Sequence, residues 1–305
     1  MALFTTTEEK SLNLGVDIGG TSIYLVLMNK NENVIYEKKV KTSRQIKEIF
    51  RIIICFLEEA NAEVEQLKFI SFGVPGTTNM MDGVVIDAPA LEWSNLPLKE
   101  EMSKYFNCPI YVENDVNCAA IGEQWKGRAI GCKDFIYLSI GTGVGSSIFT
   151  NGQLVRGSSF MAGEIGYLLF TPDVENKKYN KTGQFGMLES KLSGTALAEN
   201  GNDPKQLFKD YYENVAEAKD AVNTFKQLLA ISIANIVSLL NPERVVISGG
   251  VAQSLEGLID DINEMVKEYT PIPSKIYLSP LGEASGAIGA VAAGLNRISE
   301  KEWSV

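Results

Sequence analysis

The amino-acid sequence predicts an α/β protein built from two related half-folds. Two glycine-rich segments of similar design occur far apart in the chain, DIGGT at 17–21 and GTGVG at 141–145. Each segment follows one apolar, strand-like run and precedes another. At 305 residues the chain is long enough for about two domains with separate cores. A strand, a glycine turn and a returning strand, present twice, therefore indicate two halves of similar construction.

In the first half, three strands are predicted before the first helix. The turn NKNEN at 29–33 joins the second and third strands into an antiparallel meander. The helix is expected because Ile49, Ile53, Phe56 and Leu57 recur at helical spacing. The expected elements are strands at 12–16, 23–28 and 34–40, a helix at 46–60, strands at 69–74 and 109–112, and a helix at 116–126.

The second half repeats this order. The pair Asn151-Gly152 is typical of a tight hairpin turn between two of its strands. The expected elements are strands at 135–140, 146–149 and 153–156, helices at 187–199, 204–213 and 215–240, a strand at 244–248, a helix at 254–268, a strand at 275–279 and a helix at 284–295. We expect residues 1–118 and about 284–305 to form an N-terminal lobe, and residues 119–283 to form a C-terminal lobe.

Composition restricts the partners and the compartment. The formal net charge of −10 disfavours a nucleic-acid surface, because phosphate backbones need clustered lysine and arginine. Residues 1–13 are polar and acidic, so we expect no secretory signal there. The apolar stretch at 228–240 is too short to cross a bilayer and predicts a buried helix. We therefore expect a cytoplasmic protein with no nucleic-acid and no membrane partner.

Cysteine and histidine content narrows the chemistry. The four cysteines show no C-x-x-C spacing, so neither a disulfide framework nor a cysteine zinc site is expected. The chain contains no histidine. Proton transfer near neutral pH must then rely on carboxylate, lysine, tyrosine, cysteine or substrate groups. This excludes Ser-His triads and most zinc hydrolases.

Both glycine-rich segments are candidate phosphate-binding loops, because their backbone N–H groups point outward with no Cβ in the way. Two such loops indicate that one polyphosphate is held between the half-folds, and favour an enzyme that uses ATP. Asp17 ends the first strand, where a carboxylate can hold Mg²⁺ beside phosphates cradled by Gly19, Gly20 and Thr21. An aspartate in this place also commonly begins a turn. The second loop favours the functional interpretation.

Asn114 and Asp115 lie between a predicted strand and a predicted helix. Aspartate is a preferred helix N-cap, which is the structural interpretation. The functional interpretation is a general base that accepts the proton of an attacking sugar hydroxyl during phosphoryl transfer. Since the chain has no histidine, Asp115 is the leading candidate for the base.

Three further polar or glycine-rich points allow two interpretations each. Glu164, within GEIGY at 163–167, can accept hydrogen bonds from paired sugar hydroxyls, or can be a solvated loop residue. Glu189 is similar, and a first-turn glutamate also interacts favourably with the helix dipole. Gly249 and Gly250 allow a flat ring or a ribose to lie against the backbone, or form a simple strand-to-helix turn.

Taken together, these segments resemble the ROK family (repressor, open reading frame, kinase), which contains bacterial sugar kinases and sugar-responsive repressors. The resemblance runs from about residue 14 to residue 295. Its segments are DIGGT at 17–21, GVPG at 73–76, ENDVNCAA at 113–120, GTGVG at 141–145, AGEIGY at 162–167 and NPERVVISGGV at 241–251. The resemblance implies the two-domain fold of actin, Hsp70 and hexokinase (ribonuclease H-like), with mixed central sheets and an interdomain cleft.

The resemblance also implies a role for each matched residue, with Asp115 as the base. The ATP phosphates and Mg²⁺ are expected at Asp17, Gly19, Gly20, Thr21, Gly141, Thr142 and Gly143. Adenosine is expected at Gly249 and Gly250. The sugar is expected at Gly76, Asn114, Asp115, Glu164, Tyr167 and Glu189.

The chain departs from the family pattern at three places. Tyr167 stands where many members have a histidine, and residues 179–187 contain none of the cysteines of the family's zinc loop, so we expect no structural zinc. Some members that phosphorylate N-acetylmannosamine or β-glucosides share this Gly-Tyr pair. Ala90 stands where asparagine is frequent, which leaves the identity of the sugar open. Ser146 and Ser147 stand where further glycines are common.

The expected activity is transfer of the γ-phosphoryl group of ATP to a hexose hydroxyl, by default the 6-hydroxyl of glucose. N-Acetylmannosamine or a β-glucoside is the alternative substrate. A non-catalytic ROK repressor is a second alternative, but it needs a helix-turn-helix before the first glycine-rich segment, and the sixteen residues that precede Asp17 are neither basic nor helical in pattern. A non-catalytic, actin-like assembly protein is a third, and would not need Asp115, Glu164 and Glu189. The family leans towards homodimers, so a second copy is the expected protein partner.

Overall fold

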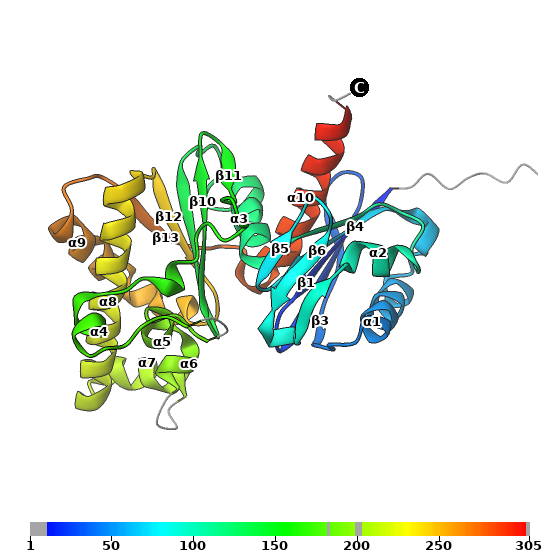
Figure 1. The fold of residues 1–305 in the computed structure, drawn as a ribbon. Coiled ribbons are helices and arrows are strands. Elements are labelled where there is room, and N and C mark those ends of the chain that lie inside the picture. The colour runs from blue at the N-terminus through cyan, green and yellow to red at the C-terminus, as the bar shows by residue number, and fades with distance from the viewer. Residues whose placement is uncertain (1–10, 182–183, 199–202, 303–305) are drawn as a thin grey trace, which may run out of the picture. The chain divides into compact units, whose positions relative to one another are not determined.

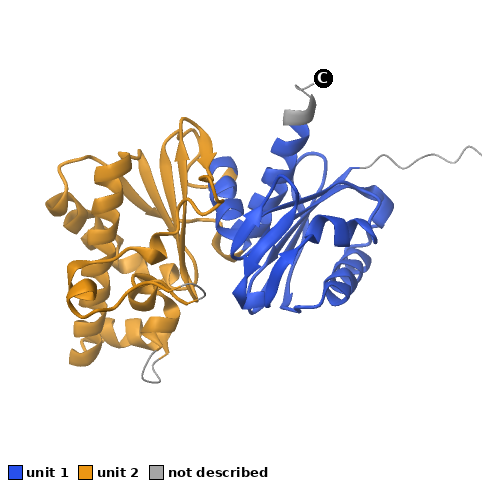
Figure 2. Ribbon diagram, viewed as in Figure 1, with its two compact units in different colours: residues 1–125, 284–305 blue, residues 126–283 orange. Residues whose placement is uncertain are grey.

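The computed structural model describes residues 11–181, 184–198 and 203–302. The chain divides into two compact units, residues 1–125 with 284–305 (unit 1) and residues 126–283 (unit 2) (Figure 2). The boundary expected at residue 118 falls inside helix α3 (Asp115–Lys126), and unit 1 keeps this helix as far as Trp125.

Unit 1 is built around a five-stranded mixed sheet with the strand order β3-β2-β1-β4-β8 (Figure 1). The strands are β1 (Leu12–Ile18), β2 (Ser22–Met28), β3 (Val34–Lys41), β4 (Leu67–Val74) and β8 (Ile110–Asn114). The first three strands form the expected antiparallel meander, and β4 and β8 run parallel to β1. The strands β1 and β4 are buried along nearly their whole length, as expected for central strands covered on both faces.

The helices of unit 1 cover this sheet. They are α1 (Ile46–Glu59), α2 (Leu98–Ser103), α3 and α10 (Ser285–Glu302), with the short turns η1 (Val64–Gln66) and η2 (Pro89–Leu91). Helix α10 packs against β1 and β4 and is rich in glycine and alanine. A Cβ at Gly289 would overlap the carbonyl oxygen of Cys118 in α3, and a Cβ at Gly15 would overlap that of Ala287. The small residues therefore permit close packing, which brings the beginning of α10 to the end of β1.

A second, three-stranded antiparallel sheet in unit 1 was not expected from the sequence. It consists of β5 (Thr77–Asn79), β6 (Val84–Ala88) and β7 (Trp93–Leu96). Strands of three to five residues are too short for a clear alternation of apolar and polar residues. Its first strand begins directly after Gly76, and the turn η2, which contains Ala90, joins β6 to β7.

Unit 2 repeats the sheet of unit 1 with the strand order β11-β10-β9-β12-β13. The strands are β9 (Phe135–Ile140), β10 (Val144–Thr150), β11 (Gln153–Val155), β12 (Arg244–Ser248) and β13 (Lys275–Leu278). The first three strands are antiparallel, and β12 and β13 run parallel to β9. Two half-folds with mixed sheets were expected, and the described structure confirms this α/β class.

The long helix α8 (Ala216–Leu240) contributes many side chains to the core of unit 2, and α9 (Ile259–Tyr269) packs against it (Figure 1). By length and composition α8 could cross a membrane, but half of its most apolar window is buried in the unit, as in a core helix. The other helical elements are η3 (Ile165–Tyr167), α4 (Thr171–Glu175), α5 (Glu189–Leu192), α6 (Gly194–Leu197), α7 (Pro204–Tyr212), η5 (Ala252–Leu258) and η6 (Gly282–Ala284).

The single helix expected at 187–199 is wrong as drawn from the sequence. Ser193 is extended and separates α5 from α6, where its hydroxyl caps α6 by accepting the N–H of Ala196 at 3.0 Å. At this break, the N–H of Gly194 donates to the carbonyl oxygen of Gly141 at 2.7 Å. The interruption thus attaches α6 to the second glycine turn.

Candidate active site

The first glycine turn joins β1 to β2 in unit 1. The N–H of Gly19 donates to the carbonyl oxygen of Ser22 at 2.8 Å and closes the turn. Thr42, after β3, donates its hydroxyl to the carbonyl oxygen of Gly19 at 2.6 Å and its N–H to that of Thr21 at 3.1 Å. Gly20 and Thr21 are exposed. The contacts with Thr42 therefore fix the backbone of the turn, and its exposed tip is accessible to a ligand.

Asp17 lies one residue before the end of β1, opposite Gly73 of β4. A Cβ at Gly286, near the beginning of α10, would overlap its carboxylate, and a Cβ at Gly73 would lie 3.4 Å from Oδ1. These two glycines thus leave the space that the carboxylate occupies. Burial raises the pKa of Asp17 well above its ordinary value, and the nearby Asp115 carboxylate raises it further.

Asp115 is the first residue of α3, but Asn114 supplies the helix cap. The side-chain oxygen of Asn114 accepts the N–H of Asn117, three residues on, at 2.9 Å. Oδ1 of Asp115 accepts the N–H of Val116 at 2.8 Å and Nδ2 of Asn114 at 3.0 Å. Burial raises the pKa of Asp115 to about 6, although these hydrogen bonds act in the opposite direction. A partly buried carboxylate with this pKa is suited to general-base work.

Gly76 is held beside this pair. Nδ2 of Asn114 also donates to the carbonyl oxygen of Gly76 at 2.9 Å. The φ of Gly76 is +84°, and a Cβ there would overlap the carbonyl oxygen of Asp87. Unit 1 therefore brings together four predicted residues at the ends of β1, β4 and β8, namely Asp17, Gly76, Asn114 and Asp115.

The second glycine turn joins β9 to β10 in unit 2. The N–H of Gly141 donates to the carbonyl oxygen of Gly143 at 2.9 Å. The carbonyl oxygen of Thr142 accepts the hydroxyl of Thr195 in α6 at 2.8 Å. With the bond from Gly194, these contacts anchor the turn on α6.

The glycine pair after β12 lies next to this turn. Gly249 has a φ of +99°, and a Cβ there would overlap the carbonyl oxygen of Ile140. A Cβ at Gly141 would lie 4.0 Å from the backbone nitrogen of Gly250, whereas a Cβ at Gly250 would meet no atom within 4 Å. Gly249 is thus required by the fold, and Gly250 borders open space.

Glu189 contacts the end of the second glycine turn. Its Oε1 accepts the N–H of Val144 at 3.0 Å, and its Oε2 accepts the N–H of Gly186 at 3.2 Å. A Cβ at Gly143 would overlap Oε1. Glu189 therefore braces the turn, a role that the sequence did not indicate. A carboxylate has further lone pairs with which it can also accept sugar hydroxyls.

Glu164 and Tyr167 lie on the surface of unit 2. Glu164 is exposed and precedes η3, and the side chain of Tyr167 is 37% exposed. Ser146 donates its hydroxyl to the carbonyl oxygen of Gly163 at 2.6 Å, and Gly163 has a φ of +91°. This serine, which stands where glycine is common in the family, thus fixes the backbone next to Glu164.

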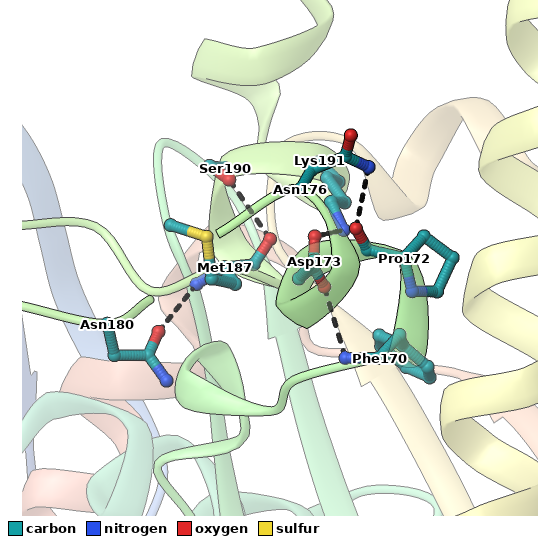
Figure 3. A network of polar contacts seen from close by, with 8 residues as sticks. All are labelled: Phe170, Pro172, Asp173, Asn176, Asn180, Met187, Ser190 and Lys191. Carbon is teal, nitrogen blue, oxygen red and sulfur yellow. Dashed lines mark hydrogen bonds and ion pairs between the residues drawn. The ribbon is translucent and has the colours of Figure 1, made fainter. Parts of the chain in front are cut away.

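A polar network follows Tyr167 and involves residues that the sequence analysis missed (Figure 3). Its main members are Asp173, Asn180 and Lys191.

The described residues contain no group of three or more histidine, cysteine, aspartate or glutamate side chains that could hold a metal ion. The expected absence of a structural zinc stays a prediction.

Comparison with known proteins identifies the family. The ROK family profile matches residues 13–296, so the chain belongs to the ROK family, as its motifs indicated. It is 30% identical over 308 residues to a glucokinase of Halalkalibacterium halodurans. That alignment covers 90% of this chain and 92% of the glucokinase. It is 28% identical over 311 residues to a xylose repressor of Caldicellulosiruptor bescii, covering 92% and 77% respectively.

The same fold occurs in solved ROK structures. The ROK family glucokinase from Streptomyces griseus, in complex with glucose and AMPPNP, superimposes with a TM-score of 0.76 at 24% identity. That alignment covers 92% of this chain and 98% of the glucokinase. The two-domain fold expected from the resemblance is therefore confirmed.

Proposed function

We propose that this ROK chain is a kinase that transfers the γ-phosphoryl group of ATP to a hydroxyl of a hexose, by default the 6-hydroxyl of glucose. The observation that carries the proposal is Asp115. Its carboxylate lies at the beginning of α3 with a pKa of about 6, while Asn114 performs the capping of the helix. In a chain without histidine, such a group is the base best suited to accept a hydroxyl proton near neutral pH.

Asp115 would act on the sugar hydroxyl during transfer. The hydrogen bonds from Val116 and Asn114 both go to Oδ1, so we assign the substrate proton to Oδ2. The sugar oxygen forms a bond to the γ-phosphorus, the bond from this phosphorus to the β,γ-bridging oxygen breaks, and ADP leaves. Such transfer depends mostly on positioning and electrostatics, so one well-placed carboxylate is sufficient.

ATP is assigned to the glycine segments of both units. In unit 1 the accessible turn from Gly19 to Thr21 would bind phosphate oxygens. In unit 2 the turn from Gly141 to Gly143 would do the same, and the neighbouring Gly249 and Gly250 would bind adenosine.

Asp17 is the residue that would hold Mg²⁺. Its carboxylate and that of Asp115 are both partly buried, and the two negative charges repel each other. A hard divalent cation would relieve this repulsion, because it takes oxygen ligands from one or two carboxylates, phosphates and water. When bound, Mg²⁺ would neutralise negative charge on the phosphates.

The sugar is assigned to Gly76, Asn114 and Asp115 in unit 1 and to Glu164, Tyr167 and Glu189 in unit 2. N-Acetylmannosamine or a β-glucoside is the alternative substrate, and the observation that favours it is Tyr167 in place of the family's histidine. We also propose a homodimer located in the cytoplasm, as the family resemblance implies.

The test is ADP release with Mg-ATP against glucose, N-acetylmannosamine, N-acetylglucosamine, mannose, fructose, allose and cellobiose. We expect turnover with one of them and a kcat about 10²- to 10⁴-fold lower for Asp115→Asn. The matched control is Asp260→Asn, because Asp260 is an exposed aspartate in the first turn of α9. No turnover with any sugar would overturn the kinase. Unchanged kcat in Asp115→Asn would overturn the base.

A further inference from the structure

In unit 2, the segment of residues 167–181 and 184–191 contains little regular structure, and both backbone and side-chain hydrogen bonds hold it, among them the N–H of Leu188 to the carbonyl oxygen of Gly166 at 3.0 Å. Besides the end of η3 and the beginning of α5, its one described helix is the five-residue α4. Several of its large apolar side chains are exposed, including Leu169, Tyr179 and Phe185. Leu188, by contrast, is fully buried in the core of unit 2, and Phe170 packs against that core. The polar network in Figure 3 adds contacts on either side of this apolar anchor.

Asn180 bridges two distant backbone stretches with one amide group. Its Nδ2 donates to the carbonyl oxygen of Tyr167 at 2.6 Å, thirteen residues earlier. Its Oδ1 accepts the N–H of Met187 at 2.9 Å, seven residues later. Both ends of the side chain are thus used to close the segment into a loop.

Asp173 makes a second closure. It is 2% exposed, its Oδ2 accepts the N–H of Phe170 at 3.1 Å, and its Oδ1 pairs with the ammonium of Lys191 in α5. Burial acts to raise the pKa of Asp173, but the hydrogen bonds from Lys191 and Phe170 outweigh it and lower the pKa. The pair of Asp173 with Lys191 joins α4 to α5.

The two closures lie on either side of Glu189. Asn180 holds Met187, two residues before Glu189, and Asp173 holds Lys191, two residues after it. Between them, the carboxylate of Glu189 accepts the N–H groups of Val144 and Gly186. The backbone that carries Glu189 is thus fixed on both sides, and its carboxylate reaches the second glycine turn from that fixed position.

We propose that Asn180 and Asp173 are positioning residues that hold Glu189 against the second glycine turn. They act through Glu189 and do not contact substrate. The inference rests on the proposed function in assigning Glu189 to the sugar, whereas the arrangement of the contacts does not depend on it. Removing Asn180 releases the N–H of Met187, two residues before Glu189, so the sugar site should loosen while Asp115, in unit 1, is untouched.

The test compares Asn180→Ala with the matched control Asn176→Ala. Asn176 is an amide of the same segment, but its Nδ2 donates to the carbonyl oxygen of Pro172 at 2.7 Å within its own turn. In Asn180→Ala we expect the KM for the sugar to rise about tenfold, as for two lost hydrogen bonds, with a smaller change in kcat. Asn176→Ala should leave both constants near their original values.

Amide hydrogen exchange in the free protein gives a second readout. The N–H groups of Val144 and Gly186, which donate to Glu189, should exchange about tenfold faster in Asn180→Ala, whereas amides in the core strand β9 should not change. Asn180→Asp serves as a second variant, because it keeps an acceptor for Met187 but sets a carboxylate oxygen against the carbonyl oxygen of Tyr167. It should shift both readouts in the same direction.

The outcomes separate the two proposals. If the original protein phosphorylates none of the sugars, the proposed function fails, and hydrogen exchange at Val144 and Gly186 still tests the positioning role. If exchange at these amides and the sugar KM are unchanged in Asn180→Ala, the positioning role is overturned and the kinase stands. Equal effects in Asn176→Ala would also overturn it, because the whole segment would then respond to any lost amide.

Discussion

The two units have the same sheet topology but place different chemical groups at the same position. In both, a glycine turn joins the first two strands of a sheet whose strand orders correspond, β3-β2-β1-β4-β8 and β11-β10-β9-β12-β13. The register makes Asp17 and Ser139 equivalent, since each is the last but one residue of the first strand. Asp17 pairs with Gly73 on the parallel neighbour, and Ser139 pairs with Ser248.

Under the proposed function, this difference would separate phosphate binding from proton transfer. Unit 1 surrounds its turn with two carboxylates of raised pKa, Asp17 and Asp115. Unit 2 has a hydroxyl at the equivalent strand position, and its nearby carboxylate, Glu189, is engaged by backbone N–H groups behind the turn. The shared topology thus provides two glycine turns, while the charge required for catalysis is assigned to one unit.

Replacing the equivalent residues tests this division most strongly. Asp17→Asn removes the charge assigned to Mg²⁺, so kcat should fall about 10²- to 10³-fold. Ser139→Ala, at the equivalent position of unit 2, should change kcat less than about threefold, because a single neutral hydroxyl is removed. Steady-state kinetics of the two variants with the sugar that gives turnover provide the measurement. Similar losses in both would contradict the assignment of catalytic charge to unit 1.

The pH dependence should include the titration of Asp115. A general base must be deprotonated, so kcat/KM for the sugar should rise with pH, level off above about 6, and fall tenfold for each unit below it. The measurement is a pH–rate profile between pH 4.5 and 8 at constant ionic strength. A profile that is flat down to about pH 4.5 would contradict a base with this pKa.

The raised pKa of Asp115 makes kcat/KM rise with pH, but it makes the stability of the protein fall with pH. Because the pKa of Asp115 is raised from 3.8 to about 6, the native state binds the proton more tightly than the unfolded state does. Stability is therefore lost as the pH rises through this interval, by roughly 1 to 3 kcal/mol. Asp115→Asn should be more stable than the original protein at pH 8, and this advantage should shrink as the pH approaches 4.

Much of the fold could be predicted because the signals for it are local. The glycine turns, the meander at the beginning of each half and the long core helix all follow from residues close together in the sequence. The break at Ser193 could not be predicted, because it depends on bonds to Gly141 and Thr142, some fifty residues away along the chain. The strands β5 to β7 were missed because they are too short for periodicity.

The site shows the same limit. Asp115 could be proposed as the base from the sequence, but the capping of α3 by Asn114 depends on side-chain geometry that the sequence leaves open. Asn180 and Asp173 gave no sequence signal, since their partners lie up to eighteen residues away in a segment without periodicity. Glycine turns are thus easier to predict from the sequence than side-chain contacts between distant segments.

The smallest expected effect concerns the glycine pair of unit 2, where fold and ligand binding can be separated. A Cβ at Gly250 meets no atom within 4 Å, and its φ lies outside the left-handed region, so Gly250→Ala should leave the melting temperature unchanged. If adenosine lies against this backbone, the added methyl should cost about 1 kcal/mol of contact, which raises the KM for ATP about fivefold. Gly249→Ala is the structural counterpart and should lower the melting temperature, because its φ is +99° and a Cβ would overlap the carbonyl oxygen of Ile140. Thermal unfolding and the KM for ATP, measured on both variants, decide the matter. An unchanged KM in Gly250→Ala would place adenosine elsewhere.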